Sequence, residues 1–281
     1  MKKISFVKMS GAGNDFIFLN RAENRGLVLS NDEINHLCDR RNGIGGDGII
    51  IISNSPKVDF TMQYFNADGS TGTLCGNGAR CAIKFAVNSG FTDGKIVKFL
   101  SDNIQYSGEY FDDENIRFDL HPPKIIEPDK KIEVENWKSK AAFLHTGSPH
   151  VVINIEENEK NIYSLDELPV EKIGREIRYL KEFEPGGTNV NFIAIKNDEI
   201  KIRTYERGVE AETLACGTGA VASAITAFLK YDLKPPVKLL TKGGDYLSVN
   251  FTYNAGKFAD VSLSGPAKEI FRGEIIIDKF S

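Results

Sequence analysis

Two cysteines, Cys75 and Cys216, open the same pattern, Cys-Gly-x-Gly-Ala, in this 281-residue chain. After each copy comes an alanine-rich stretch whose apolar residues have the i, i+3, i+4 spacing of a helix. A β-rich stretch and a glycine-bearing loop precede each copy. The copies lie 141 residues apart, about half the chain, whereas solenoid repeats span about 20–50 residues. The pattern therefore indicates two similar domains that face each other with one cysteine each.

A cysteine at a helix start has a chemical advantage, because the unpaired N–H groups and the positive end of the helix dipole favour its thiolate. The glycines let an anion, such as a substrate carboxylate, approach those N–H groups. Proton exchange at a stereocentre needs a base on one face of the carbon and an acid on the other. One thiolate and one thiol meet this need without a cofactor. We predict an epimerase or racemase with Cys75 and Cys216 as its catalytic residues, although a single copy of the pattern would more often be structural.

Other polar and cysteine residues have simpler interpretations. Glu206 and Arg207 could hold an ammonium and a carboxylate, and the alternative is a surface ion pair worth ~0–1 kcal/mol. Cys38 and Cys81 are interpreted as small buried residues. The chain has no Cys-x-x-Cys pair, so we expect neither a metal site nor a redox site. Residues 43–48 fit Gly-x-Gly-x-x-Gly, but they follow an expected helix and open an apolar run, which argues against a dinucleotide site.

Composition narrows the class of protein. Apolar residues make up 41% and charged residues 26%, as in a globular protein. The net charge of −4 and the lack of a dense basic stripe argue against nucleic acid as a partner. The longest clearly apolar run, residues 48–52, is far shorter than the ~20 residues that cross a membrane as a helix. The N-terminus lacks the apolar region of a signal peptide, so we expect a cytoplasmic protein.

The chain alternates between short β-rich stretches and fewer helical ones. Nine strands are expected, at residues 48–52, 59–65, 96–100, 115–120, 151–155, 191–195, 200–205, 247–251 and 258–263. Helices are expected at residues 31–41 and 166–179 and after each of the two cysteines. The domain boundary is expected near the prolines at residues 122–123. Residues 1–121, completed by 268–281, would form the first domain, and residues 122–267 the second.

Over nearly its whole length, the chain resembles the diaminopimelate epimerase family. The matching segments are residues 6–16, 38–48, 65–70, 75–81, 146–150, 187–192, 205–208 and 212–220. The resemblance implies two pseudo-symmetric α+β domains, each a curled, mostly antiparallel sheet around a central helix, with the active site in the cleft between them. It also implies interconversion of LL- and meso-diaminopimelate in lysine and peptidoglycan precursor synthesis. The resemblance further implies a homodimer.

The resemblance assigns a role to each site residue. Cys75 and Cys216 would be the acid/base thiols, and Asn14 would contact the reacting end of the substrate. The carboxylate at the reacting carbon would bind the backbone N–H groups of Gly76, Asn77, Gly217 and Thr218. The distal end would bind Asn66, Asn189, Glu206 and Arg207. His150 would orient Glu206 or tune a thiol, and a merely structural histidine is the alternative.

This sequence departs from the family at two positions. Some members carry Gln where this chain has Gly48, and many carry Asn where it has Ser148. Two other functions remain open. A related two-cysteine racemase would act on proline or hydroxyproline, which lack a distal amino-acid arm. A non-catalytic amino-acid binding protein of the same fold would not need both cysteines.

Overall fold

The computed structural model describes residues 1–72, 74–112, 114–135, 137–158 and 163–277. The chain divides into two compact units, each with its own core. The first unit comprises residues 1–119 and 264–281, and the second comprises residues 120–263. The boundaries expected from the sequence, after residues 121 and 267, stay a prediction. Among the described residues, no helix combines the length and the apolar character needed to cross a membrane.

In the residues that the structure describes, the first unit has a sheet of eight strands and two helices. Its strands are β1 (Lys2–Gly11), β2 (Asn14–Asn20), β3 (Gly48–Asn54), β4 (Phe60–Asn66), β5 (Ile96–Ser101), β6 (Ile104–Asp112), β7 (Asn115–Asp119) and β17 (Lys268–Ile277). The helices are α1 (Asn31–Cys38) and α2 (Gly76–Asn88). Strand β1 pairs antiparallel with both β17 and β2. The β2–β3 and β4–β5 pairs are parallel, and the β3–β4, β5–β6 and β6–β7 pairs are antiparallel.

From β10 onward, the second unit repeats the order of β2 to β7 with their two helices, with one short strand added. Its elements are β8 (Ile126–Val134), β9 (Trp137–His145), β10 (Pro149–Asn154), α3 (Val170–Arg178), β11 (Asn189–Lys196), β12 (Glu199–Glu206), β13 (Ala211–Thr213), α4 (Gly217–Tyr231), β14 (Val237–Leu240), β15 (Tyr246–Asn254) and β16 (Lys257–Gly265). Short 3₁₀ turns lie at Ile155–Glu157 and Lys181–Phe183. Parallel pairs again occur at β10–β11 and β12–β14, among antiparallel neighbours. The pseudo-symmetric α+β fold expected from the sequence is confirmed.

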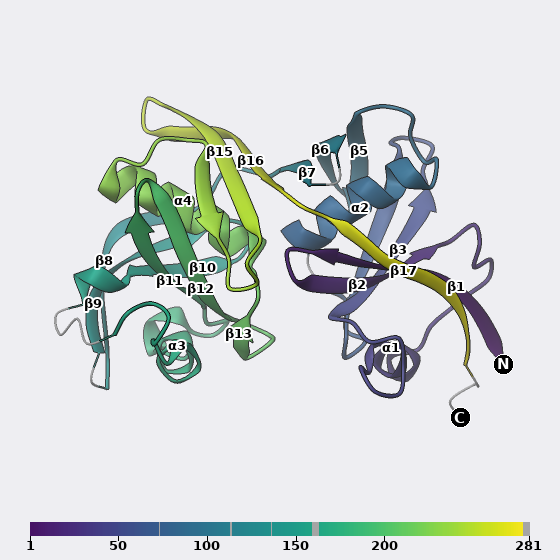
Figure 1. The fold of residues 1–281 in the computed structure, drawn as a ribbon, viewed down its shortest axis with the longest axis horizontal. Coiled ribbons are helices and arrows are strands. Elements are labelled where there is room, and N and C mark those ends of the chain that lie inside the picture. Colours follow the sequence, from purple (N-terminus) through teal and green to yellow (C-terminus); the bar gives the residue numbers. More distant parts are fainter. Residues whose placement is uncertain (73, 113, 136, 159–162, 278–281) are drawn as a thin grey trace. The chain divides into compact units, whose positions relative to one another are not determined.

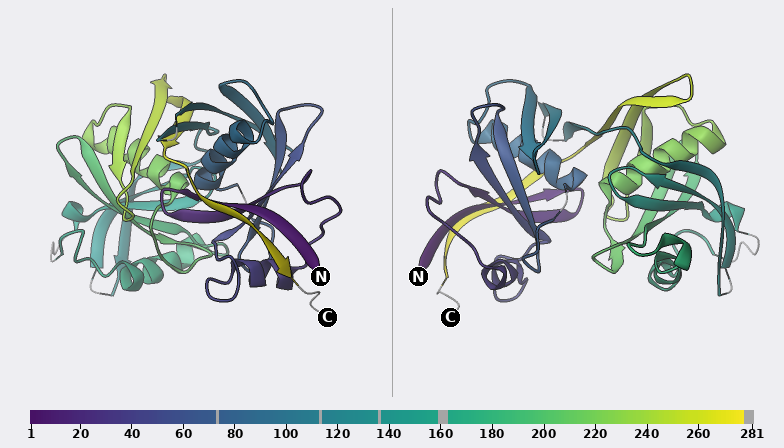
Figure 2. Two further views of the ribbon diagram at one scale, coloured as in Figure 1. Left: turned by 45° about the vertical axis from the view of Figure 1, so that its right-hand side comes forward. Right: turned by 180° about the vertical axis from the view of Figure 1, so that it is seen from behind.

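Each unit wraps its sheet around one helix. In the first unit, α2 packs against β1, β2, β3, β6 and β7, while α1 packs outside on β3. In the second unit, α4 packs against strands β8 to β12 and against β14 and β15, while α3 packs outside on β8, β11, β12 and β13. Figures 1 and 2 show α2 and α4 each lying along the inner face of its own sheet. These two enclosed helices are the ones that begin after Cys75 and Cys216.

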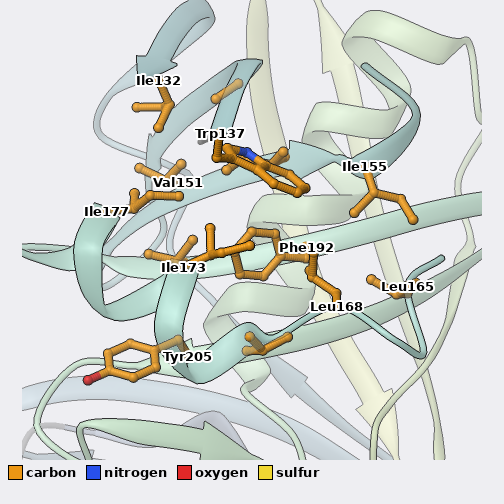
Figure 3. Close-up of a cluster of buried hydrophobic side chains, with 14 of the residues drawn as sticks. Ile132, Trp137, Val151, Ile155, Leu165, Leu168, Ile173, Ile177, Phe192 and Tyr205 are labelled. Carbon is orange, nitrogen blue, oxygen red and sulfur yellow. The ribbon is translucent and has the colours of Figure 1, made fainter. Parts of the chain in front are cut away.

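Alternation along the strands gives each sheet two different buried faces. On β11, Val190 and Phe192 join the core under α3. Figure 3 shows most of the side chains of this core. Asn191, between those two residues of β11, points to the other face, where its Oδ1 approaches Gly219 of α4. Strand β3 is covered on both faces, which explains its unbroken isoleucine run at residues 49–52.

All nine expected strands are present, with ends that differ by at most three residues. Two helices are shorter than expected. Helix α1 begins after the capping residue Ser30, which forms a reciprocal capping box with Glu33, but it ends at Cys38. Helix α3 begins only at Val170, because Pro169 precedes it and restricts the backbone before it. The stretch at 270–277 lies in β17, which completes the first unit's sheet.

Truncating Phe192 should destabilise the second unit. The side chain is fully buried, and its ring packs edge-to-face on Trp137 with centroids 6.2 Å apart. We expect Phe192→Ala to lower the free energy of unfolding in urea by about 3–5 kcal/mol. Phe111→Ala is the control, because that ring is 45% exposed and should cost much less. Equal losses for the two variants would contradict this account of the core.

Candidate active site

Both cysteines occupy the N-cap of a central helix. Their backbones are extended, with φ/ψ of −99°/127° at Cys75 and −123°/113° at Cys216. The carbonyl of each accepts the first helical hydrogen bond, at 2.8 Å from Ala79 N and 2.9 Å from Ala220 N. Neither cysteine side chain makes a capping hydrogen bond to its helix. Neither thiol is therefore used to cap the helix that begins after it.

We call the group of Cys75, Asn77 and Asn14, which belong to the first unit, the first half-site. The Asn77 side chain, fully buried in the first turn of α2, donates to Asn14 Oδ1 at the start of β2. The Nδ2 of Asn14 donates to Asp47 Oδ2 at 3.0 Å. The start of β2 and the loop before β3 are thus tied to the helix that begins after Cys75. Cys75 itself is partly exposed, whereas Cys216 is 8% exposed.

Asn66 lies at the end of β4, where Gly48 is its strand partner. Its Nδ2 donates to Ser70 Oγ at 3.0 Å. The family's glutamine has no room at position 48 here, because a Cβ would lie 2.3 Å from Phe65 O and 2.6 Å from Tyr64 Cε2. The Tyr64 ring therefore fills the space that a longer side chain would occupy.

The second half-site is a continuous polar network around Cys216. The Thr218 Oγ1 lies 3.7 Å from Cys216 Sγ, 2.9 Å from His150 Nε2 and 3.2 Å from Ser148 Oγ. Ser148 Oγ also lies 2.9 Å from His150 Nε2. Ser148, the family departure, is therefore fully engaged in holding the residues next to the thiol.

Asn191 fixes the protonation of the fully buried His150 ring. The Nδ2 of Asn191 donates to Val151 O at 3.0 Å and faces His150 Nδ1 at 3.1 Å, while its Oδ1 accepts from Thr204 Oγ1 at 3.0 Å. Because an amide nitrogen only donates, His150 Nδ1 must accept, and the neutral ring carries its proton on Nε2. Burial lowers the pKa of His150 from 6.5 to about 3, and repulsion from His145 and Arg207 acts in the same direction. His150 is a neutral donor toward Thr218 and Ser148.

Asn189 connects this network to the Glu206–Arg207 pair. Its Nδ2 donates to Pro149 O at 2.9 Å and to Ser148 Oγ at 3.3 Å, and its Oδ1 accepts from Arg207 N at 2.9 Å. Glu206 Oε2 accepts from Thr213 Oγ1 at 2.9 Å. Arg207 lines a cavity of about 340 Å³ within the second unit, together with Phe143, His145, Gly147, Pro149, Glu182, Phe183, Glu184, Gly186 and Gly187.

The second glycine of each cysteine pattern serves packing. A Cβ at Gly219 would lie 2.3 Å from Asn191 Oδ1, and a Cβ at Gly78 would lie 2.9 Å from Ile50 Cδ1. Both positions face the interior of their own unit and not an approaching anion. At these two positions, glycine is therefore required for packing inside each unit and not for access of an anion, contrary to the expectation from the sequence.

Cys38 and Cys81 differ from the pair at the helix starts. Both are buried, and burial raises the pKa of each thiol to about 12. They therefore stay protonated at neutral pH, which agrees with the structural interpretation of both residues. In the described part of the chain, no group of three or more His, Cys, Asp or Glu side chains is arranged to hold a metal ion.

Sequence reasoning missed several residues that hold the site residues in place, namely Asp47, Arg80, Asn191 and Thr204. The available signal for Asn191 was a polar residue between the apolar Val190 and Phe192 of strand β11. A buried amide in such a place needs partners, which here are His150, Val151 and Thr204.

The His150 ring should resist protonation in mildly acidic solution. We expect ¹⁵N NMR of the imidazole at pH 5 to give the neutral Nε2–H form, because protonation is shifted to about pH 3. Unfolded chains bind this proton near pH 6.5, so the group's contribution to stability is present above that pH. As the pH falls from 6.5 toward 3, that contribution is lost at up to about 1.4 kcal/mol per pH unit. A charged His150 ring at pH 6 would refute the assignment.

Comparison with known proteins agrees with this geometry. The sequence profile of the diaminopimelate epimerase family matches residues 6–126 and 142–267. The chain is 40% identical to diaminopimelate epimerase from Chlorobaculum tepidum over 273 residues, covering 96% of this chain and 100% of that one. It is 38% identical to diaminopimelate epimerase from Aquifex aeolicus over 284 residues, covering 97% and 98%.

Among solved structures, the phenazine biosynthesis protein of the PhzF family from Bacillus anthracis has the same fold. It superposes with a TM-score of 0.74 over 99% of this chain and 100% of that chain, at 14% identity. That likeness concerns the fold alone. The profile match and the two close sequence relatives carry the assignment: this chain belongs to the diaminopimelate epimerase family.

Proposed function

We propose that this protein interconverts LL- and meso-diaminopimelate without a cofactor, with Cys75 and Cys216 exchanging the α-proton. The observation that carries the proposal is the repeated N-cap cysteine, one on the central helix of each unit. In this family, the reaction serves the synthesis of lysine and of peptidoglycan precursors. The substrate would meet both half-sites at once, so that each thiol reaches one face of the same carbon.

The reaction needs one proton removed and one delivered on the opposite face. One cysteine acts as the thiolate that takes the proton from the α-carbon, and the other acts as the thiol that returns one. The α-proton of an amino acid is weakly acidic, so negative charge growing toward the carboxylate must be stabilised. The N–H groups of Gly76, Asn77, Gly217 and Thr218 supply fixed donors at two helix starts, which cost no reorganisation during the reaction.

Thr218 has a second task beside Cys216. Its hydroxyl faces the Nε2–H of His150 and lies 3.7 Å from Cys216 Sγ. With Nε2–H donating to Thr218 Oγ1, the hydroxyl proton has two acceptors in reach, Ser148 Oγ and Cys216 Sγ, and it favours the thiolate when it points toward the sulfur. His150 therefore acts on the thiol through Thr218.

The distal end of the substrate, which does not react, is held by Asn66, Asn189, Glu206 and Arg207. A guanidinium that lines a cavity suits a carboxylate, and a neighbouring glutamate suits an ammonium. Asn189 joins this grip to the reacting end, because it hydrogen-bonds both Arg207 N and Ser148 Oγ. A substrate with amino-acid groups at both ends would use both regions.

Two alternatives make different demands on these residues. A proline or hydroxyproline racemase would need both thiols but would leave the Arg207 cavity without a charged group to bind. An amino-acid binding protein would need the distal grip but neither thiol. Both cysteines and the cavity favour the epimerase.

Solvent exchange tests the proposal directly. In heavy water, the reduced enzyme should place deuterium at an α-carbon of diaminopimelate, read by NMR or mass spectrometry. Cys75→Ala and Cys216→Ala should each lower turnover by more than about a hundred-fold, because one step of proton transfer loses its group. Cys38→Ala is the matched control and should retain activity.

Proline, assayed in parallel, should not exchange. Exchange of proline in preference to diaminopimelate would establish the racemase, and full activity of either active-site cysteine variant would overturn the two-thiol mechanism.

We also propose a homodimer that works in the cytoplasm. The support for a dimer is strand β17, which exposes Ile270, Phe271 and Ile276 at 54%, 47% and 64%. Exposed apolar groups on one strand favour association. Sedimentation equilibrium should give twice the chain mass of 31.1 kDa. Ile276→Lys, placed in this patch, should weaken association, whereas Tyr179→Lys, exposed elsewhere at 56%, should not. A monomer at every concentration would contradict the proposal.

A further inference from the structure

Arg80, on α2, has the largest fully buried side chain among the described residues. It lies five positions after Cys75 and points back toward the start of the helix. Its Nη1 donates to Gly76 O at 3.3 Å, and its Nη2 donates to Asn77 Oδ1 at 2.9 Å. A buried guanidinium is costly to desolvate, so this placement calls for an explanation beyond packing.

A chain of hydrogen bonds runs outward from this arginine to a carboxylate. Arg80 donates to Asn77 Oδ1, Asn77 Nδ2 donates to Asn14 Oδ1, and Asn14 Nδ2 donates to Asp47 Oδ2. Asp47 is held in turn by Asp15 N at 3.2 Å and by Arg40 Nη2 at 2.8 Å. The two half-site asparagines thus stand between a cation and an anion.

The two ends of this series of hydrogen bonds, Arg80 and Asp47, decide the orientation of both amides. A guanidinium can only donate, so Asn77 must turn its oxygen toward Arg80 and its nitrogen toward Asn14. An ionised carboxylate can only accept, so Asn14 must turn its nitrogen toward Asp47. Flipping either amide would set two donors or two acceptors against each other. The direction is therefore fixed before any substrate arrives.

We propose that Arg80 and Asp47 are positioning residues that lock the Asn14 and Asn77 amides in the orientation that the reaction uses. Asn14 then offers a ligand only its second Nδ2–H and the remaining lone pair of Oδ1. Asn77 is held so that its backbone N–H stays in line with the start of α2. This inference rests on the proposed function only for the identity of the ligand.

The second unit holds the matching position by other means. Thr218 corresponds to Asn77, 141 residues later, and its partner is the neutral His150. Position 221, which corresponds to Arg80, is Val. The residue two places after each cysteine is therefore fixed in both units, by a buried cation in the first and by a neutral ring in the second.

Arg80→Met tests the proposal against a matched control, Lys84→Met. Lys84 is a second buried cation on the same helix, and its Nζ donates to Ala267 O at 2.9 Å, away from the asparagines. We expect Arg80→Met to lower kcat/KM for diaminopimelate by about ten- to a hundred-fold, the cost typical of a misplaced binding group. Lys84→Met should lower thermal stability but leave the kinetic constants of the folded enzyme unchanged. Arg80→Lys, which keeps the charge, should recover part of the activity.

Coupling to Asn14 separates positioning from general damage. In an Asn14→Ala background, Arg80→Met should have little further effect on kcat/KM, because the group that it positions is already gone. The side-chain amide resonances of Asn14 and Asn77 should shift in Arg80→Met and stay in place in Lys84→Met. This NMR measurement does not depend on the reaction, so it tests the proposal even if the wild-type protein fails to epimerise diaminopimelate.

Asp47→Asn provides a second test if Arg80→Met does not fold. The Asp47 side chain is 37% exposed, so this substitution should leave the fold intact. Asparagine at 47 can donate or accept, so the Asn14 amide loses its fixed direction and kcat/KM should fall about ten-fold. Arg41→Gln, at an exposed neighbouring position, leaves Asp47 and its hydrogen-bond partners in place and should retain activity. Unchanged kinetics and unchanged amide resonances in Asp47→Asn, or an undiminished effect of Arg80→Met in the Asn14→Ala background, would overturn the proposal.

Discussion

The unusual start of the two central helices is the constraint on which both half-sites depend. Helix N-caps are usually Ser, Thr, Asp or Asn, whose side chains satisfy an early N–H group and contribute about 1 kcal/mol. Cys75 and Cys216 occupy that position without making such a bond. Stability that a side-chain cap would supply must come from elsewhere, and the curled sheets supply it by enclosing α2 and α4. Packing, and not a side-chain cap, therefore holds the starts of both helices in place.

The sequence predicts these helix starts well because the required information is local. The repeated Cys-Gly-x-Gly-Ala pattern and the apolar spacing behind it locate both helices, and β-rich stretches locate nine strands. Strands such as β8, with Pro128 and the charged residues of 129–131, and β1, which alternates irregularly, do not stand out in composition. Their pairing with β9 and with β17 and β2 makes them strands, and that pairing is decided by distant residues.

The residues that hold the site in place were harder to find, for the same reason. Arg80 reads as an ordinary polar position on a helix, yet the sheet buries it completely. Asn191 and His150 are adjacent only because β10 and β11 pair in parallel, in the register that sets Val151 against Val190. Family resemblance named the residues expected to contact the substrate. It did not reveal that the Arg80 cation supports Asn77 near Cys75, or that the neutral His150 ring supports Thr218 near Cys216.

Strand β17 also has a consequence for how the chain folds as it is made. The first unit is discontinuous in sequence, because Lys2 pairs with Ile277 and the pairing continues along most of β1. The second unit, residues 120–263, is continuous. During synthesis, β1 therefore keeps an unpaired edge until the whole second unit and then β17 have emerged from the ribosome. The second unit can fold during that time, whereas the sheet around α2 stays one strand short until β17 pairs with β1.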